Sequence, residues 1–462
     1  MPRMTTDASR RAFLKRSSML AMAGAAAPWA LNLAAMSEAA AATATDYKAL
    51  VCVFLYGGND YGNTLIPYDA ARYALYQGMR PKLAYTQAQL AATALAPSVA
   101  LAGGLQYALA PELAPLMPIF DAGKMGVMLN VGTLVQPTTK AQYASGATPL
   151  PPRLFSHNDQ QSVWQASSPE GATSGWGGRM GDLFESGNGN AVFTCVNVSG
   201  NAVYLSGKET SQYQVSTTGP VALNGVKSAL FGSAACSTAL QGLITASSTN
   251  LMENEYARVT ARSLSAGGTL TTALAGGPTI ATPFPTAGSN SLADQLKLVA
   301  RMISTAGAVG AKRQVFFVSL GGFDNHDGLA TIHPALLTSV AQALSAFYAA
   351  TVELGVASQV TTFTASDFGR TLTANDGSDH GWGSMHFMLG GAVNGGRYYG
   401  TPPVVANGGP DDVGQGRLLP STSVDQYAAT MGKWLGISDS DLLTVLPNLD
   451  NWDASQRNLG FV

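Results

Sequence analysis

Acidic side chains follow three apolar, strand-like segments of this chain. Asp60, Asp324 and Asp367 each come a few residues after such a segment ends. Ligands of open α/β sheets bind outside the carboxyl ends of the strands, so these carboxylates are expected to meet at one edge. Glycine pairs at 57–58 and 321–322 would let the backbone turn sharply there. Carboxylates brought together repel each other unless a cation or a proton lies between them.

Histidine is scarce in this chain, and its few copies are clustered. The chain has five histidines, and all but His157 lie beyond residue 320, interleaved with aspartates. Neutral imidazole together with carboxylate is the ligand set of zinc and similar divalent ions. The sequence therefore predicts a divalent metal site for zinc, manganese or calcium, with candidate ligands Asp60, Asp324, His326, Asp367, Asp379, His380 and His386. The alternative is a polar network that holds long loops without an ion.

His157 follows Ser156 at the start of a helical pattern that ends near Ala166. Free N–H groups at a helix N-terminus attract anions, so Ser156 fits a nucleophile that receives a phosphate or sulfate. The alternative, an ordinary N-terminal capping serine, is the interpretation we favour. Thr64 is a weaker candidate nucleophile. The candidate catalytic residues are Ser156, His157 and Arg370.

His333 is a further histidine whose position suggests two interpretations. It stands directly before Pro334, which fits the first position of a predicted helix. His333 would then be either an N-terminal capping residue or a metal ligand.

Alternating strands and helices must position these residues. Apolar runs at 49–56, 125–131, 191–198, 314–320 and 359–364 predict strands buried on both faces, as in parallel sheets. Apolar residues at helical spacing predict helices over 291–308, 334–354 and 424–435. This alternation predicts an α/β fold, with a mostly parallel central sheet and helices on both faces. Residues from about 200 to 290 are rich in Gly, Ser and Thr and predict a loop-rich insertion or lid.

The first 44 residues have the features of an export signal. Residues 9–15, SRRAFLK, form a twin-arginine signature, and small residues at 42–44 provide a cleavage site. The apolar run between them is too weak and too interrupted to predict a membrane span. We therefore expect export by the twin-arginine machinery, a periplasmic or secreted protein without a stable span, and a single domain over 45–462. An uncleaved anchor is the alternative.

The composition excludes one class of partner and leaves a disulfide open. Charged residues make up 12% of the chain, and its net charge is −2. Residues 1–44 hold five basic and two acidic side chains, which leaves −5 for the rest and no basic face for nucleic acid. Cys52 is expected to be buried in a strand. Cys195 and Cys236 could pair in an oxidising compartment, and the sequence leaves this open.

Several motifs, in this order, resemble family 1501 of the domains of unknown function: residues 57–60, 321–326, 366–371 and 378–383. That family is similar in fold to the alkaline phosphatase and sulfatase superfamily. The resemblance implies a two-metal site at the strand ends that hydrolyses phosphate or sulfate esters. It matches Asp60 to the early ligand, Asp324 and His326 to the mid-chain ligands, Asp367 or Asp379-His380 to the late Asp-His step, and His386 to the last ligand.

The chain also departs from the superfamily pattern. Phe368 follows Asp367 where a histidine is expected, so His380 would have to supply that imidazole from the next loop. No Cys-x-Pro-x-Arg motif is present, which argues against a formylglycine nucleophile. These departures favour an alternative function: an exported protein that keeps the fold without catalysis and binds a small ester or a cell-surface polymer.

Overall fold

The apolar run Lys48–Leu55 forms strand β1 near the middle of a nine-stranded sheet, in a computed structural model that describes residues 46–462. The expected signal segment, residues 1–44, lies outside this range. Contacts group Tyr47–Val462 into one compact unit. The strand order is β10-β4-β9-β8-β1-β7-β5-β6, with β11 beside β4. The other strands of the sheet are β4 (Met125–Gly132), β5 (Cys195–Asn197), β6 (Tyr213–Gln214), β7 (Arg313–Leu320), β8 (Val360–Ser366), β9 (Ser384–Leu389), β10 (Arg397–Tyr399) and β11 (Thr422–Ser423).

The centre of the sheet is parallel, as predicted. β1 pairs in parallel with β7 on one side and with β8 on the other, so that Leu55 lies opposite both Leu320 and Ser366. The carboxyl ends of these three strands therefore meet at one edge. β9 runs antiparallel to β4 and β8 and makes the sheet mixed. A small separate sheet pairs β2 (Leu65–Pro67) with β3 (Tyr107–Leu109).

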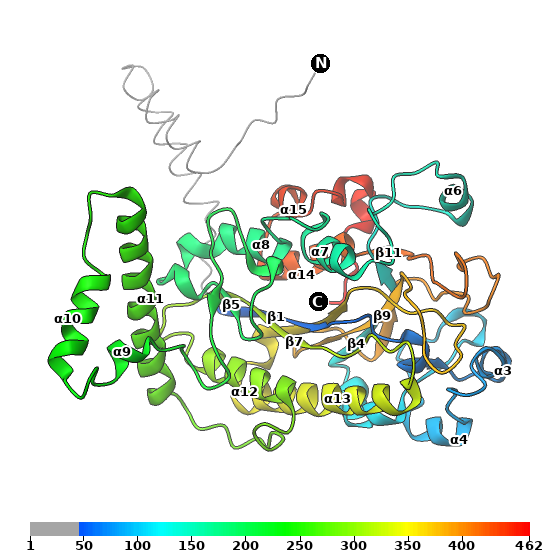
Figure 1. Ribbon diagram of the computed structural model, residues 1–462. Coiled ribbons are helices and arrows are strands. Elements are labelled where there is room, and N and C mark those ends of the chain that lie inside the picture. Colours follow the sequence, from blue (N-terminus) through cyan, green and yellow to red (C-terminus); the bar gives the residue numbers. More distant parts are fainter. Residues whose placement is uncertain (1–45) are drawn as a thin grey trace, which may run out of the picture. The chain divides into compact units, whose positions relative to one another are not determined.

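Helices cover both faces of the sheet (Figure 1). One face carries α7 (His157–Ala166), α8 (Trp176–Phe184), α14 (Val424–Leu435) and α15 (Asp439–Val445). The other face carries α5 (Met117–Asp121), α12 (Ser291–Ser304) and α13 (Leu329–Glu353). Three further short helices are α3 (Ala70–Met79), α4 (Gln87–Leu90) and α6 (Lys140–Ser145). The predicted α/β class is confirmed.

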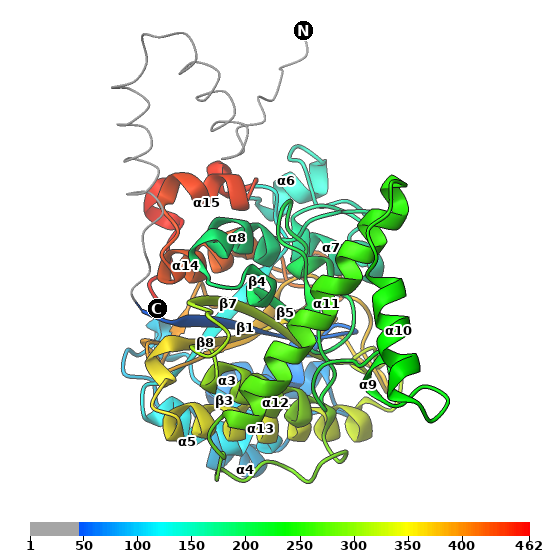
Figure 2. The same ribbon diagram turned by 90° about the vertical axis from the view of Figure 1, so that its left-hand side faces the viewer.

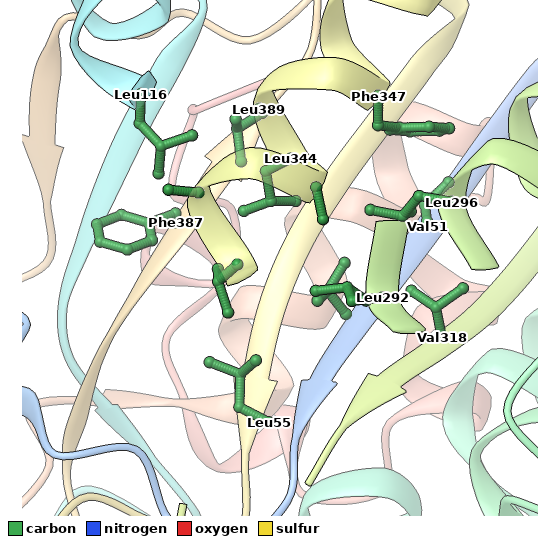
Figure 3. Close-up of a cluster of buried hydrophobic side chains, with 14 of the residues drawn as sticks. Val51, Leu55, Leu116, Leu292, Leu296, Val318, Leu344, Phe347, Phe387 and Leu389 are labelled. Carbon is green, nitrogen blue, oxygen red and sulfur yellow. The ribbon is translucent and has the colours of Figure 1, made fainter. Parts of the chain in front are cut away.

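Alternate residues of β1 enter two different cores, which explains why its apolar run is continuous. Val51 and Leu55 face α12 and α13, where Leu296 and Phe347 lie in the same cluster (Figure 3). Phe54 faces the other way, with the helices on the α14 side. Burying a large apolar side chain contributes about 1.5–3 kcal/mol, so both cores help to hold the strand ends in place.

Helix α13 begins at Leu329, five residues before the predicted start at Pro334. The proline lies inside the helix, at its sixth residue, and does not mark its beginning. The helix extends to residues before Pro334 because two of them, Leu329 and His333, are buried. By length and composition alone α13 could cross a membrane, but half of its most apolar window is buried in this fold.

The segment expected to be rich in loops contains three helices: α9 (Asn224–Lys227), α10 (Ala234–Ile244) and α11 (Leu251–Gly276). Its Gly, Ser and Thr content masks an apolar spacing on α11, where Ala266, Leu270 and Ala273 are buried. Residues 277–290 are free of helix and strand, as expected for the later part. All three cysteines are free thiols, so Cys195 and Cys236 do not pair.

Candidate metal centre

The ends of β1, β7 and β8 bring Asp324 and Asp367 to one place. The backbone N–H of Gly57, after β1, donates to both carboxylate oxygens of Asp367, at 3.1 and 3.2 Å. Gly57 has a φ of +114°, and a Cβ there would lie 2.4 Å from the backbone N of Asp324. Only glycine therefore allows the loop after β1 to pack so closely beneath the loop after β7.

Two imidazoles and one carboxylate oxygen form a nearly equilateral triangle at this edge. His157 is the first residue of α7, and His380 comes from the loop between β8 and β9. Their Nε2 atoms lie 3.0 Å apart. Oδ1 of Asp324 lies 3.3 Å from Nε2 of His157 and 3.5 Å from Nε2 of His380. Zinc bonds of about 2.0–2.1 Å in a tetrahedron place neighbouring ligands about 3.3 Å apart, so the triangle has the size of one tetrahedral face.

The other nitrogen of each imidazole is held by an acceptor. Nδ1 of His157 lies 2.6 Å from Oδ2 of Asp367, and Nδ1 of His380 lies 2.6 Å from the carbonyl oxygen of Phe155. Each Nδ1 therefore carries the proton, which leaves the Nε2 lone pairs facing each other and Asp324. The buried ring of Phe368 packs against both imidazoles, with centroids 4.8 and 5.0 Å away. The position where the superfamily pattern expects a histidine thus supports two histidines from elsewhere.

Asp367 orients the imidazole of His157 and does not itself face the triangle. It is buried, and Gln161 donates to it at 2.8 Å in addition to Gly57 and His157. Sequence reasoning missed Gln161. The signal was its place four residues after His157 on a predicted helix, where the two side chains share a face.

The two imidazoles respond differently to their surroundings. Burial lowers the pKa of His380, and the neighbouring His157 lowers it further. Burial also acts against a charged His157, but its hydrogen bond to Asp367 outweighs this and raises its pKa. His380 is therefore the imidazole more readily available as a neutral ligand.

Arg370, predicted as catalytic, is fully buried and contacts Asp324. Its Nη2 lies 2.5 Å from Oδ1 of Asp324 and donates to the carbonyl oxygen of Phe323 at 3.2 Å. Burial would raise the pKa of Asp324, but Arg370 outweighs this and lowers it. Arg370 therefore keeps the Asp324 carboxylate ionised and fixes its position.

His326 and Asp379 lie on the solvent side of the triangle. Nε2 of His326 is 3.0 Å from both Oδ1 of Asp324 and Nε2 of His380, and its side chain is half-exposed. Oδ1 of Asp379 is 3.9 Å from Nδ1 of His326, and Arg417 holds the other Asp379 oxygen at 3.2 Å. Both predicted ligands thus belong to the cluster, as a second group beside the triangle. Sequence reasoning missed Arg417.

A hollow of about 400 Å³ opens next to this second group. It is lined by polar and apolar atoms in about equal measure, from His326, Thr371, Thr373, Ala374, Asn375, Gly377, Ser378, Asp379 and Gln415.

Asp60 and His386 do not join the cluster. Asp60 is buried in an ion pair with Arg80, whose Nη2 lies 2.8 Å from its Oδ2. His386 lies on the α14 side of β9, 5.5 Å from the ring of Trp164, with Nδ1 3.2 Å from Oγ1 of Thr364. Burial lowers the pKa of His386 to about 3. The structure brings neither residue to the cluster, because Arg80 and the backbone N–H of Asn63 engage both oxygens of Asp60 and the core encloses His386.

The two candidate nucleophiles have other partners. Oγ of Ser156 donates to Oδ2 of Asp159 at 2.9 Å and caps no helix N–H group. Thr64 is buried and donates to the carbonyl oxygen of Asp60. His333 is also buried, with Nε2 3.0 Å from Oδ1 of Asn59, so it is neither a cap nor a member of the cluster. In the described part of the chain, neither the hydroxyl of Ser156 nor that of Thr64 contacts the triangle.

Comparisons with known proteins place the chain beside one family. The family described as "Protein of unknown function (DUF1501)" matches residues 47–451. A search of curated protein sequences finds no match.

Solved structures similar to the chain include Ps i-CgsB in complex with k-i-k-neocarrahexaose, at 10% identity and a TM-score of 0.34, covering 88% of this chain and 77% of that one. Another is the PsFucS1 sulfatase from Pseudoalteromonas sp., at 11% identity and a TM-score of 0.32, covering 93% and 75%. A third, BT33494S-sulf, described under glycosaminoglycan metabolism by Bacteroides thetaiotaomicron, has 12% identity and a TM-score of 0.35, covering 86% and 74%. At these scores the likenesses say nothing about the activity of this chain.

Proposed function

Because the chain belongs to the DUF1501 family, whose description assigns no activity, we propose a function from its own site: metal-dependent hydrolysis of phosphate or sulfate esters. The observation that carries this proposal is the triangle of His157, Asp324 and His380. Its edges of 3.0, 3.3 and 3.5 Å match one face of a zinc tetrahedron. A site that uses three protein ligands keeps a fourth position for water or substrate, as catalytic zinc sites do.

The donor atoms favour zinc among the divalent ions. Two imidazole nitrogens and one carboxylate oxygen suit zinc, whereas calcium takes six to eight oxygen ligands. The site holds one ion in this proposal, because Asp60 and His386 lie away from it. When bound, the ion supplies a Lewis acid that lowers the pKa of water and offsets the negative charge of the ester.

The surrounding side chains have separate tasks in this mechanism. Asp367 and the Phe155 carbonyl aim the two imidazoles, and Arg370 keeps Asp324 ionised. Water is the nucleophile, since Oγ of Ser156 is engaged by Asp159. His326, half-exposed beside the triangle, gives a proton to the departing alcohol; solvent takes up the proton that the attacking water loses and returns one to His326. The hollow next to His326 receives the rest of the ester.

The N-terminal signature supports a place for this activity outside the cytoplasm. The SRRAFLK segment at 9–15 supports export of the folded protein, with its ion already bound, by the twin-arginine machinery. Replacing both Arg10 and Arg11 by Lys should then leave the protein in the cytoplasmic fraction. Equal periplasmic amounts of variant and unchanged protein would contradict this route.

The test combines elemental analysis with an ester panel. We expect about one zinc per chain, lost in His157→Ala, Asp324→Ala and His380→Ala. The matched control is His386→Leu, which removes a histidine outside the cluster and should keep the ion. Zinc-loaded protein should hydrolyse aryl or sugar phosphates, diesters or sulfates, and the three variants should not.

Two outcomes separate the proposal from its alternative. A metal-loaded protein that is inert across the panel would leave the site as a binding site, as in the non-catalytic hypothesis. A protein that binds no ion, with all variants folded, would remove the basis of both the ion and the reaction.

A further inference from the structure

Helices α10 and α11 stand out from the side of the molecule (Figures 1 and 2). The second half of α11 rests on the body, where Ala266, Leu270 and Ala273 join the core cluster with α12. The first half extends beyond that cluster and packs against α10. One face of α11 therefore passes from a buried environment into solvent along its length.

The solvent half of this face is apolar. Met252, Tyr256 and Val259 are 78%, 64% and 43% exposed. Spacings of four and three residues place them on the same stripe as Ser263, Ala266, Leu270 and Ala273. Leu251, the first residue of α11, and Leu243, near the end of α10, are also exposed, at 82% and 74%. Isolated exposed apolar residues are ordinary, but three at heptad spacing on one face form the kind of surface that packs against another helix.

Charges beside the stripe indicate what covers it. Glu253 lies in the first turn of α11 and Glu255 follows at the start of the second, whereas Arg258 and Arg262 lie further along the helix. Glu255 pairs with Arg258 of its own helix at 2.7 Å, but both stay half-exposed or more and can also reach a neighbour. If a second α11 lay antiparallel to this one, the arginines of each helix would lie beside the glutamates of the other. The stripe is therefore complementary to itself.

We propose that a second copy of this chain covers the stripe, so that the protein forms a twofold dimer through antiparallel α11 helices. Met252, Tyr256 and Val259 of the two copies form the apolar centre of this interface. Glu255 of each copy lies opposite Arg262 of the other. Within one helix these two residues are seven positions, or about 10 Å, apart. A twofold axis uses the same patch on both subunits, so every contact occurs twice. A lipid surface fits less well, because Glu253 and Glu255 would enter it along with the apolar residues.

A charge-reversal cycle tests this interface with the purified protein. Sedimentation should show a dimer at micromolar concentration. Glu255→Arg and Arg262→Glu, each alone, place like charges opposite each other and should raise the dissociation constant at least about tenfold. The double variant Glu255→Arg with Arg262→Glu restores opposite charges and should recover most of that loss. Glu170→Arg, outside α9–α11, is the matched control and should leave the dimer unchanged.

Other outcomes overturn the proposal. They are a monomer at all concentrations up to about 100 μM, where an interface of this kind should be populated, or a dimer whose single variants weaken without recovery in the double variant. Thermal unfolding of each variant checks that the body stays folded, since α11 rests on it. Monomer that floats with lipid vesicles would assign the stripe to a membrane surface instead. The metal site lies elsewhere, so loss of the dimer and loss of the ion are separate results.

Discussion

Oδ2 of Asp367 lies 2.6 Å from Nδ1 of His157, and this contact turns Nε2 of the same ring toward Asp324 and His380. Asp367 is itself held by the backbone N–H of Gly57 and by Gln161. The direction of one imidazole thus depends on the loop after β1, on β8 and on α7 together. In metal sites, the nitrogen of a histidine ligand that does not bind the metal regularly donates to a group that orients the ring.

Asp367→Asn should weaken zinc binding by about 10–100-fold, because the amide no longer fixes the ring and its proton as the carboxylate does. It should also lower the pKa of His157, which the carboxylate raises against the effect of burial. Competition with a chelating dye measures the affinity, and proton NMR of the apo protein follows the imidazole. Asp379→Asn, which removes a carboxylate outside the triangle, should bind zinc as before. Equal affinity in both variants would contradict the orienting role.

Arg370→Met should shift zinc binding to higher pH. Burial alone would raise the pKa of Asp324, but the Arg370 guanidinium outweighs the effect of burial and lowers that pKa. Without the guanidinium the pKa rises, so protons compete with the ion at a higher pH. Zinc occupancy measured from pH 4 to 8 gives the midpoint in each protein. Arg417→Met, which releases Asp379 instead, should leave the midpoint in place; a common shift would assign the effect to lost net charge.

The sequence predicted the fold, and it predicted the edge of the sheet at which Asp324 and Asp367 meet. Continuous apolar runs can be buried only between two helical layers, so the run at β1 led directly to a parallel sheet. Asp324 and Asp367 then followed, because parallel strands bring their carboxyl ends to the same edge. The scarcity of histidine pointed to His326 and His380 for the same cluster.

The sequence did not determine which way each side chain would point. Asp60 has the spacing of a ligand, but Arg80, which directly follows α3 twenty residues later, pairs with it in the interior. His386 has the type of a ligand, but it lies on the α14 side of β9, against Trp164. Phe368 replaces an expected histidine, and it packs beneath His157 and His380 because α7 and the loop between β8 and β9 meet in the folded chain.

Asp60→Asn should destabilise the protein without affecting its metal. Asp60 and Arg80 form a fully buried pair, and removing one partner of such a pair costs about 3–5 kcal/mol. Urea unfolding of metal-free protein measures the loss, and elemental analysis of the folded variant should still find zinc. Asp60→Leu with Arg80→Met removes both charges and should recover part of the stability. Loss of zinc with unchanged stability would return Asp60 to the ligand set.

His386→Leu should remove part of the acid sensitivity of the fold. Burial lowers the pKa of His386 to about 3, against about 6.5 in an unfolded chain. Between these values the unfolded state binds the proton and the native state does not, so stability falls as the pH falls, by up to about 1.4 kcal/mol per pH unit. This contribution is complete above about pH 6.5 and lost by about pH 3. Urea unfolding at a series of pH values, in the presence of a chelator, should give a flatter profile for His386→Leu. His326→Ala is the control for the loss of a histidine; equal slopes in the two variants would show that the burial of His386 does not cause the acid sensitivity.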